Sequence, residues 1–303
     1  MNIFMIISKI NGGLGNQMFQ YAAGRAMSLQ MKSKLLLDTS FFKRDYLDLK
    51  HEKKILINLF PKIESLHFET IDDSFIIEQK RNGKKFANKI CDCVYQIFNI
   101  NSVYKTVSEN QTLTYQADFH SQKIKNLYLI GDWQNENYFL EYELDIRNDF
   151  KFPKIDINSR NGNLLDLAHN NNSVSIHVRR GDYLSSITHT ALEQSYYKEA
   201  INIVNNRISD PIFFVFSDDI GWCKNNLNLK YAHYVDNNFE EKSYLDMQLM
   251  SNCNHNIIAN SSFSWWGAWL NNSSDKIVIS PKVWLPKLKI LSSNVIPEKW
   301  ISI

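Results

Sequence analysis

The chain has 303 residues, of which 44% are hydrophobic and 13% aromatic, enough for two domains with substantial cores. Its 34 Lys and Arg nearly balance 32 Asp and Glu, giving a formal net charge of +2, so the basic excess of a broad nucleic-acid-binding surface is absent. Of its 4 cysteines only Cys91 and Cys93 are close, which excludes a disulfide framework or a recognisable zinc motif and favours reduced thiols.

The N-terminal segment predicts a strand, a glycine-rich loop, a helix and a second strand, at residues 3–10, 11–17, 18–31 and 35–38. Backbone N–H groups of such a loop, at a helix N-terminus, can approach a bound anion or sugar. The spacing matches neither G-x-G-x-x-G nor the Walker motif, so a tight turn remains the alternative. The first apolar run is too short for a signal peptide core or a membrane span, and we expect a cytoplasmic protein.

The middle of the chain is harder to interpret. Residues 41–119 show no clear periodicity, although residues 78–97 are compatible with one or two helices. Residues 127–131 predict a strand, and the Trp133 and Gln134 that follow could touch a ligand or pack in the core. Residues 138–150 predict a helix.

Pro153 and the polar stretch after it give the best domain boundary. We therefore expect an N-terminal domain at 1–155, a second domain at 156–285 and a C-terminal tail at 286–303. From Ser280 onward the chain is locally basic and apolar, which suits either an anionic membrane surface or a solvated face.

Strands and helices alternate through the second half. Strands are predicted at 174–178, 211–216, 231–235, 255–259 and 276–280, and the strand at 276–280 is expected to be the last. Helices are predicted at 195–208, 219–226 and 242–253, and residues 260–270 are expected to open a further helix. Ser217 or Asp218 is the expected N-cap of the short helix at 219–226. This alternation predicts a parallel, doubly wound sheet.

The heptad 177–183, His-Val-Arg-Arg-Gly-Asp-Tyr, lies where the first of these strands ends. Alternation along the strand places His177 and Arg179 on one face, opposite the apolar residues. Adjacent guanidinium groups repel each other, and a diphosphate would relieve that repulsion with matching geometry. The alternative is a salt-bridge cluster with Asp182 and another carboxylate, and the heptad alone does not decide between them.

Polar residues also follow two further strands, so three groups of them stand at strand carboxyl ends: His177, Arg179 and Asp182; Asp218 and Asp219; Ser261, Ser262 and Ser264. A doubly wound sheet binds ligands at this edge, which favours a nucleotide site over the simpler role of helix capping. Since the chain has no D-x-D triplet, we expect the protein itself, without a metal, to neutralise the phosphates.

Four sequence blocks resemble those of one enzyme family. Residues 177–183 resemble the H-x-R-R-x-D-Y signature of α1,2-fucosyltransferases, and residues 12–22, 216–219 and 260–270 are similar to the other blocks of that family. The order is the same, and the resemblance is to the bacterial branch of glycosyltransferase family 11, which lacks the membrane anchor and stem of the animal enzymes.

The resemblance implies an α/β fold with two Rossmann-like domains facing a cleft, the GT-B type. It implies inverting transfer of L-fucose from GDP-β-L-fucose without a metal or other cofactor. Arg179 would bind the β-phosphate, His177 and Asp218 would contact guanine or ribose, and the serines would hold phosphates. The implied donor-binding residues are Gly13, Gly15, Asn16, Gln17, His177, Arg179, Arg180, Asp218, Ser261, Ser262, Phe263 and Ser264, and the implied catalytic residues are Arg179, Asp182 and His189.

The motifs do not settle the general base. Asp182 is expected to orient Arg179 or the donor, and His189 and Glu193 are candidates for removing the proton. The implied acceptor is O-2 of a terminal galactose-like residue on an oligosaccharide or lipid-linked surface-glycan (O-antigen) precursor, chosen through residues 41–150. No nucleic-acid partner is expected, and peripheral contact with the inner membrane is left open.

Two other functions remain open at this point. One is a glycosyltransferase on the same scaffold that uses another donor or acceptor. The other is a non-catalytic sugar- or nucleotide-binding protein in which Trp133, Trp265 and Trp266 serve as stacking platforms.

Overall fold

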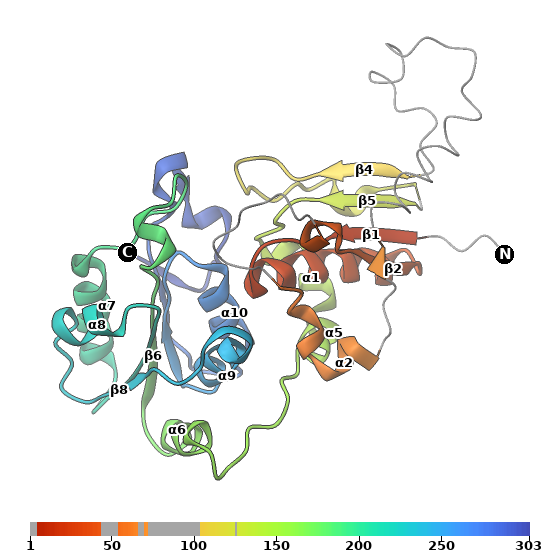
Figure 1. Cartoon of the computed structure of the whole chain (residues 1–303). Helices are drawn as coiled ribbons and strands as arrows, with labels where there is room; N and C mark the ends of the chain where they lie inside the picture. Colours follow the sequence, from red (N-terminus) through yellow and green to blue (C-terminus); the bar gives the residue numbers. More distant parts are fainter. Residues whose placement is uncertain (1–4, 44–53, 66–69, 72–103, 125) are drawn as a thin grey trace, which may run out of the picture. The chain divides into compact units, whose positions relative to one another are not determined.

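The structure is a computed structural model that describes residues 5–43, 54–65, 70–71, 104–124 and 126–303 (Figure 1). The chain divides into two compact units, Met1–Lys151 and Phe152–Ile303. The helical segment predicted at 78–97, which includes Cys91 and Cys93, lies outside the described residues.

The first unit is built on a parallel sheet of five strands in the order β3-β2-β1-β5-β4. The strands are β1 (Met5–Lys9), β2 (Lys34–Asp38), β3 (Thr70–Ile71), β4 (Lys105–Ser108) and β5 (Leu127–Ile130). The helices among its described residues are α1 (Leu14–Gln30), α2 (Pro61–Ser65) and α5 (Glu143–Asp149). The predicted strand–loop–helix–strand unit is thus confirmed in β1, α1 and β2.

Two helix boundaries in this unit differ from the prediction. Helix α1 begins at Leu14, so Gly15, Asn16 and Gln17 lie in its first turn and not in the preceding loop. The predicted helix at 138–150 is shorter, because two 3₁₀ turns, Glu136–Tyr138 and Leu140–Tyr142, precede α5.

The second unit contains a six-stranded parallel sheet in the order β13-β10-β9-β6-β7-β8. Its strands are β6 (Ser173–Val178), β7 (Ile212–Ser217), β8 (Ala232–Val235), β9 (His255–Ile257), β10 (Val278–Ser280) and β13 (Ile301–Ser302). Its helices are α6 (Arg160–His169), α7 (Gln194–Arg207), α8 (Ile220–Asn226), α9 (Tyr244–Ser251) and α10 (Ser262–Leu270).

This strand order confirms the predicted doubly wound sheet. From β6 the chain moves outward through β7 and β8, then returns to β9 on the other side of β6 and moves outward again. The order therefore reverses between β6 and β9, which is the point where open α/β sheets bind ligands at their carboxyl edge.

Strand β6 is buried along its whole length, although its sequence alternates between apolar and polar residues. Val174, Ile176 and Val178 pack in one cluster with residues of α7. On the polar face, the buried Ser175 Oγ accepts a hydrogen bond from Asn256 Nδ2 at 2.7 Å. Ser175 is tolerated at the centre of the sheet because the side chain of Asn256 satisfies its hydroxyl group.

The segment after β10 extends the sheet, so the predicted final strand is not the last. β11 (Val283–Leu285) and β12 (Ile290–Leu291) form an antiparallel hairpin, and β13 then pairs in parallel with β10. Residues 286–303 accordingly belong to the second unit. In the part of the chain that the structure describes, no helix combines the length and the apolar composition needed to span a bilayer.

Gly12, in the turn before α1, has a left-handed backbone conformation that a substitution can test. Its φ is +73°, and a Cβ there would approach Asn16 Nδ2 to 2.9 Å, whereas a Cβ on Gly13 would meet nothing within 4 Å. We expect Gly12→Ala to lower the unfolding free energy by about 1–2 kcal/mol, since alanine tolerates a left-handed backbone poorly. Gly13→Ala is the matched control, and equal stability of the two variants in urea titrations would contradict this account.

Candidate functional site

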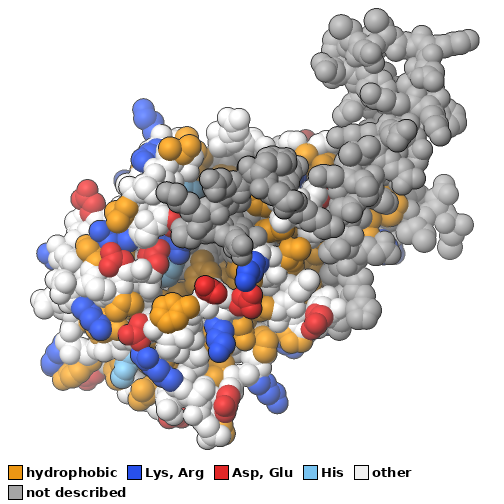
Figure 2. Space-filling model, in the orientation of Figure 1, with side chains coloured by type: hydrophobic (Ala, Val, Ile, Leu, Met, Phe, Trp, Pro, Cys, Tyr) orange, Lys and Arg blue, Asp and Glu red, His pale blue; other side chains and the backbone are white. Residues whose placement is uncertain are grey.

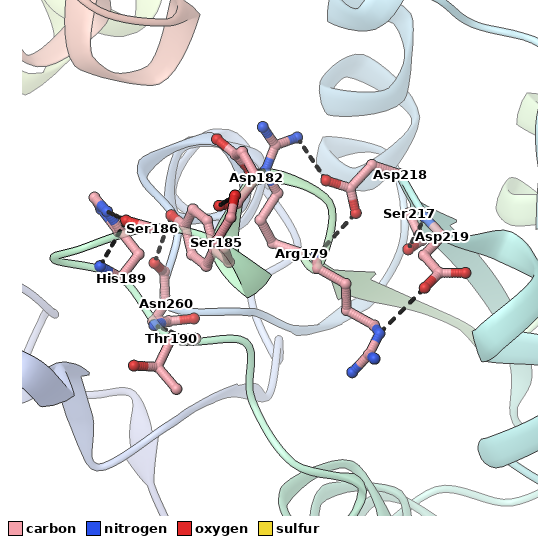
Figure 3. Close-up of polar contacts among 12 residues, drawn as sticks. Arg179, Asp182, Ser185, Ser186, His189, Thr190, Ser217, Asp218, Asp219 and Asn260 are labelled. Atoms are coloured by element: carbon pink, nitrogen blue, oxygen red, sulfur yellow. Dashed lines mark hydrogen bonds and ion pairs between the residues drawn. The ribbon is translucent and has the colours of Figure 1, made fainter.

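The three polar groups predicted from the sequence follow the carboxyl ends of β6, β7 and β9, which are neighbouring strands in the sheet. Figure 3 shows Arg179 and Asp182 beside Asp218 and Asp219, with Asn260 on the next segment of the same edge. The site therefore lies at the reversal of strand order in the second unit.

Arg179 is held between two carboxylates. Its Nε lies 2.9 Å from Asp182 Oδ1, and its Nη1 lies 3.1 Å from Asp218 Oδ2 (Figure 3). Desolvation opposes the positive charge, but the carboxylates of Asp218 and Asp182 outweigh it and raise the pKa of Arg179. The two ion pairs hold Arg179 in place, and because 38% of its side chain is exposed, it is also accessible to a ligand.

Arg180 faces a different environment. Its Nε lies 3.2 Å from Asp219 Oδ2, and its guanidinium carbon lies 4.3 Å from the centre of the Trp222 ring. Only 18% of the side chain is exposed. These contacts give Arg180 a packing role against α8, and the predicted donor contact stays a prediction.

Asp218 and Asp219 link strands β6 and β7. Asp218 Oδ1 accepts the backbone N–H of Arg180 at 2.9 Å, while its other oxygen pairs with Arg179. Gly181 permits this approach, since a Cβ there would lie 2.9 Å from Asp218 Oδ2. Asp219 Oδ1 caps α8 by accepting from Trp222 N at 3.0 Å, so the N-cap is Asp219 and not the predicted Ser217 or Asp218.

These contacts have the form of the salt-bridge cluster that the sequence left open as an alternative. Two guanidinium groups face three carboxylates, those of Asp182, Asp218 and Asp219, so the arginines are already neutralised. A diphosphate would have to replace a carboxylate partner or use the remaining guanidinium N–H groups. Arginine has five N–H donors, so Arg179 can do the latter while it keeps both of its ion pairs.

His177 is buried with 6% of its surface exposed, and its ring centre lies 5.6 Å from that of Phe263. Burial, together with the charge of Arg179, lowers the pKa of His177 to about 3, so the imidazole is neutral at physiological pH. Its Nδ1 is buried without a hydrogen-bond partner among the described residues. The ring can thus donate or accept a hydrogen bond but cannot act as a cation.

The N-terminus of α10 lies after β9 and presents backbone N–H groups that have no intrahelical partner. Ser261 is the N-cap residue, and Ser262 and Phe263 occupy the first turn. Ser264 is turned inward, since its buried Oγ donates to Ser261 O at 3.2 Å. A phosphate at this helix end would therefore meet N–H groups, and a contact from the Ser264 hydroxyl stays a prediction.

The candidate bases lie in the segment after the arginines. The His189 ring packs against Tyr183 with 4.5 Å between ring centres and the planes tilted by 32°, and Thr188 Oγ1 lies 2.9 Å from its Nδ1. Glu193 is exposed and precedes α7 as its N-cap residue. The contacts described for His189 and Glu193 favour neither residue as the general base, and the identity of the base stays a prediction.

In the first unit, two predicted residues lie at the start of α1. Asn16 Oδ1 accepts from Gln134 Nε2 at 3.2 Å, which joins the helix start to the end of β5. The buried side chain of Gln17 braces residues 54–57, with Nε2 donating to Lys54 O at 2.8 Å and Oε1 accepting from Leu56 N at 2.8 Å. This bracing role was not predicted, and donor contact by Gly13, Gly15, Asn16 and Gln17 stays a prediction.

Glu109, immediately after β4, was missed in the sequence. Its Oε2 accepts the backbone N–H groups of Asp132 at 2.7 Å and Trp133 at 2.8 Å, and burial raises its pKa to about 7. A polar residue at a strand end is the signal that could have identified it, but β4 lies in the stretch whose periodicity was unclear.

The tryptophans offered as stacking platforms have no exposed surface. Trp133, Trp265 and Trp266 are each 0% exposed, and Trp265 Nε1 donates to Val295 O at 3.1 Å. They belong to the core, so the stacking role is wrong. No group of three or more His, Cys, Asp or Glu side chains suited to a metal occurs within the described ranges, and metal independence stays a prediction.

Comparison with known proteins identifies the family. The profile described as "Glycosyl transferase family 11" matches residues 3–303. The chain belongs to this family. It is 35% identical to an Escherichia coli protein named "Alpha-1,2-colitosyltransferase", with 99% of both chains covered. It is 33% identical to the Escherichia coli "O-antigen biosynthesis glycosyltransferase WbnK", with 98% of this chain and 99% of that one covered.

The family 11 assignment makes this chain a glycosyltransferase. A solved structure of Arabidopsis thaliana FUT1, a variant in complex with GDP, has the same fold, with a TM-score of 0.52 at 12% identity over 91% of this chain and 70% of that one. The expected class, α/β with two Rossmann-like units, is confirmed.

The neutral His177 gives this family 11 glycosyltransferase a defined dependence of stability on pH. Its folded-state pKa of about 3 lies below the ordinary value of 6.5, so the unfolded chain binds the proton more readily. Its contribution to stability is complete above pH 6.5 and decreases as the pH falls toward 3. Between pH 6 and 4, wild type should lose about 1.4 kcal/mol per pH unit relative to His177→Gln. If urea titrations show the same difference in unfolding free energy between the two proteins at every pH from 6 to 4, the lowered pKa of His177 is refuted.

Proposed function

We propose that this glycosyltransferase is an inverting α1,2-fucosyltransferase that transfers L-fucose from GDP-β-L-fucose to O-2 of a terminal galactose-like residue. The main support is the position of Arg179, which is partly exposed and held at the carboxyl edge where the strand order reverses, in a chain that family 11 matches over residues 3–303. That is where an open α/β sheet binds a nucleotide.

In the proposed reaction the acceptor O-2 attacks C1 of fucose while the bond from C1 to the β-phosphate oxygen breaks. The electron pair of that bond leaves with GDP, and the acceptor proton passes to a base. Arg179 and the N-terminus of α10 would stabilise the charge that develops on the diphosphate. Neutral His177 and the carboxylate of Asp218 would contact guanine or ribose.

Asp182 and His189 lie in the segment that follows Arg179. Asp182 has a positioning role in this scheme, because its carboxylate already pairs with Arg179 at 2.9 Å. His189 and Glu193 are the proposed alternatives for the base. Charge relief by protein groups makes the proposed reaction independent of a metal or other cofactor.

A second donor is favoured by one specific observation. The relative with 35% identity is named as a colitosyltransferase, and colitose is L-fucose without its 3-hydroxyl group. A pocket that hydrogen-bonds this hydroxyl discriminates strongly against the sugar that lacks it, whereas an apolar pocket discriminates weakly. GDP-colitose is therefore the alternative donor to test.

The proposed acceptor is an oligosaccharide or a lipid-linked precursor of a surface glycan. Support comes from the relative named as an O-antigen biosynthesis glycosyltransferase. The acceptor-selecting region proposed at 41–150 lies partly outside the described residues. A nucleic-acid acceptor is disfavoured by the charge balance, and the coloured part of the surface in Figure 2 shows basic and acidic side chains interspersed.

A donor assay tests the proposal directly. Purified protein is incubated in EDTA with GDP-fucose or GDP-colitose and with lactose or Galβ1-3GalNAc, and GDP release and product mass are followed. We expect a product heavier by one deoxyhexose that an α1,2-specific fucosidase cleaves. If the protein uses only GDP-colitose, GDP-fucose is wrong as the proposed donor and GDP-colitose takes its place. Activity that is recovered only when manganese is added would refute metal independence.

Arg179→Ala should lower kcat by about 10²–10³, because a preorganised charge contact to the leaving diphosphate is removed. The matched control is Arg160→Ala, since Arg160 is a surface arginine paired with Asp236 at 2.6 Å and 56% exposed. Circular dichroism establishes that both variants are folded. Near-normal turnover of a folded Arg179→Ala protein would rule out the role assigned to this residue.

A further inference from the structure

Two exposed segments beside the site carry aliphatic side chains that nothing in the second unit covers. One is the turn and loop after the arginines, where Leu184 is 63% and Ile187 is 88% exposed. The other is the hairpin of β11 and β12, where Leu288 is 53% and Leu291 is 49% exposed. Burying aliphatic groups of this size is favourable, so a cluster of them at a surface indicates an interaction.

The two segments are held against each other. Lys287 Nζ in the hairpin donates to the backbone carbonyl of Ser186 in the loop. Behind them, the buried Asn260 Nδ2 donates to Thr190 O and to Trp284 O, each at 3.1 Å. In Figure 1 these green and dark blue segments occur together in the second unit. We call this surface the lip, which comprises Leu184, Ile187, Lys287, Leu288, Lys289 and Leu291.

The charge of the lip has a single sign. Lys287 and Lys289 flank Leu288 at the hairpin tip, and both lysines are exposed. No acidic residue lies between Asp182 and Glu193 or between Asp275 and Glu298. Aliphatic side chains next to lysines, without carboxylates among them, complement an interface of acyl chains and anionic headgroups.

The lip is also joined to the site. Tyr183 OH, between Asp182 and the loop, donates to Asn260 O at 3.2 Å, and the Asn260 side chain binds both halves of the lip. A surface that binds at the lip would thus lie next to Arg179 and Asp182.

We propose that the lip docks this protein on a bilayer containing anionic lipids, with Ile187 and Leu288 inserted among the headgroups and Lys287 and Lys289 on the lipid phosphates. The proposal depends on neither the donor nor the acceptor. Its test uses no substrate, so its failure is distinguishable from failure of the proposed function.

The test is co-sedimentation of the full chain with vesicles of phosphatidylcholine, with and without phosphatidylglycerol. We expect binding to the mixed vesicles that weakens with salt. Ile187→Ser with Leu288→Ser should weaken binding at least about tenfold. Lys287→Gln with Lys289→Gln should weaken it roughly fivefold per lysine at low salt, while the side-chain amide introduced in place of the Lys287 ammonium keeps a donor for the Ser186 carbonyl.

The matched control is Leu144→Ser with Ile157→Ser, which removes aliphatic side chains that are 83% and 78% exposed elsewhere on the chain. Thermal melts show that each variant is folded. Absence of binding to mixed vesicles at low salt overturns the proposal, as does equal weakening by the control. A dimer in analytical ultracentrifugation that the lip variant dissociates, without vesicle binding, would assign the lip to a second copy of the chain and also overturns it.

Discussion

The carboxylate of Asp218 is the contact on which the site depends. Two adjacent arginines at the end of a strand repel each other, and a neighbouring strand must supply the compensating charge. Asp218 pairs with the Arg179 side chain through one oxygen and accepts the backbone N–H of Arg180 through the other, while Asp219 pairs with the Arg180 side chain. This interaction ties β6 to β7 and leaves Arg179 partly exposed at the carboxyl edge. The absence of a side chain at Gly181 is what allows the approach.

The same contacts separate the roles of the two arginines. Arg180 lies on Trp222 and pairs with the aspartate that caps α8, so it stabilises the fold around the site. Arg179 retains guanidinium donors toward solvent and is the residue that can receive a diphosphate. The carboxylates of Asp182 and Asp218 thus hold Arg179 at the carboxyl edge without using all of its guanidinium N–H donors.

Sequence reasoning located the elements of the second unit because strands and helices alternate there with clear periodicity. It failed where local signals compete. The glycines after β1 suggested a loop, yet α1 begins at Leu14, since a first helical turn tolerates residues whose N–H groups have no partner. The tryptophans near the strand ends suggested stacking platforms, yet burial of their large rings places them in the core. Glu109 was not identified because the strand that it follows was not recognised from the sequence.

The sequence alone determined the family blocks, the alternation that builds the doubly wound sheet and the residue types gathered at three strand ends. All of these depend on short-range pattern along the chain. Only the tertiary structure decided which carboxylate pairs with which arginine, that His177 is neutral, and that Asn260 joins the loop at Thr190 to the hairpin at Trp284. These properties arise from contacts and desolvation between residues far apart in sequence, which no local pattern records.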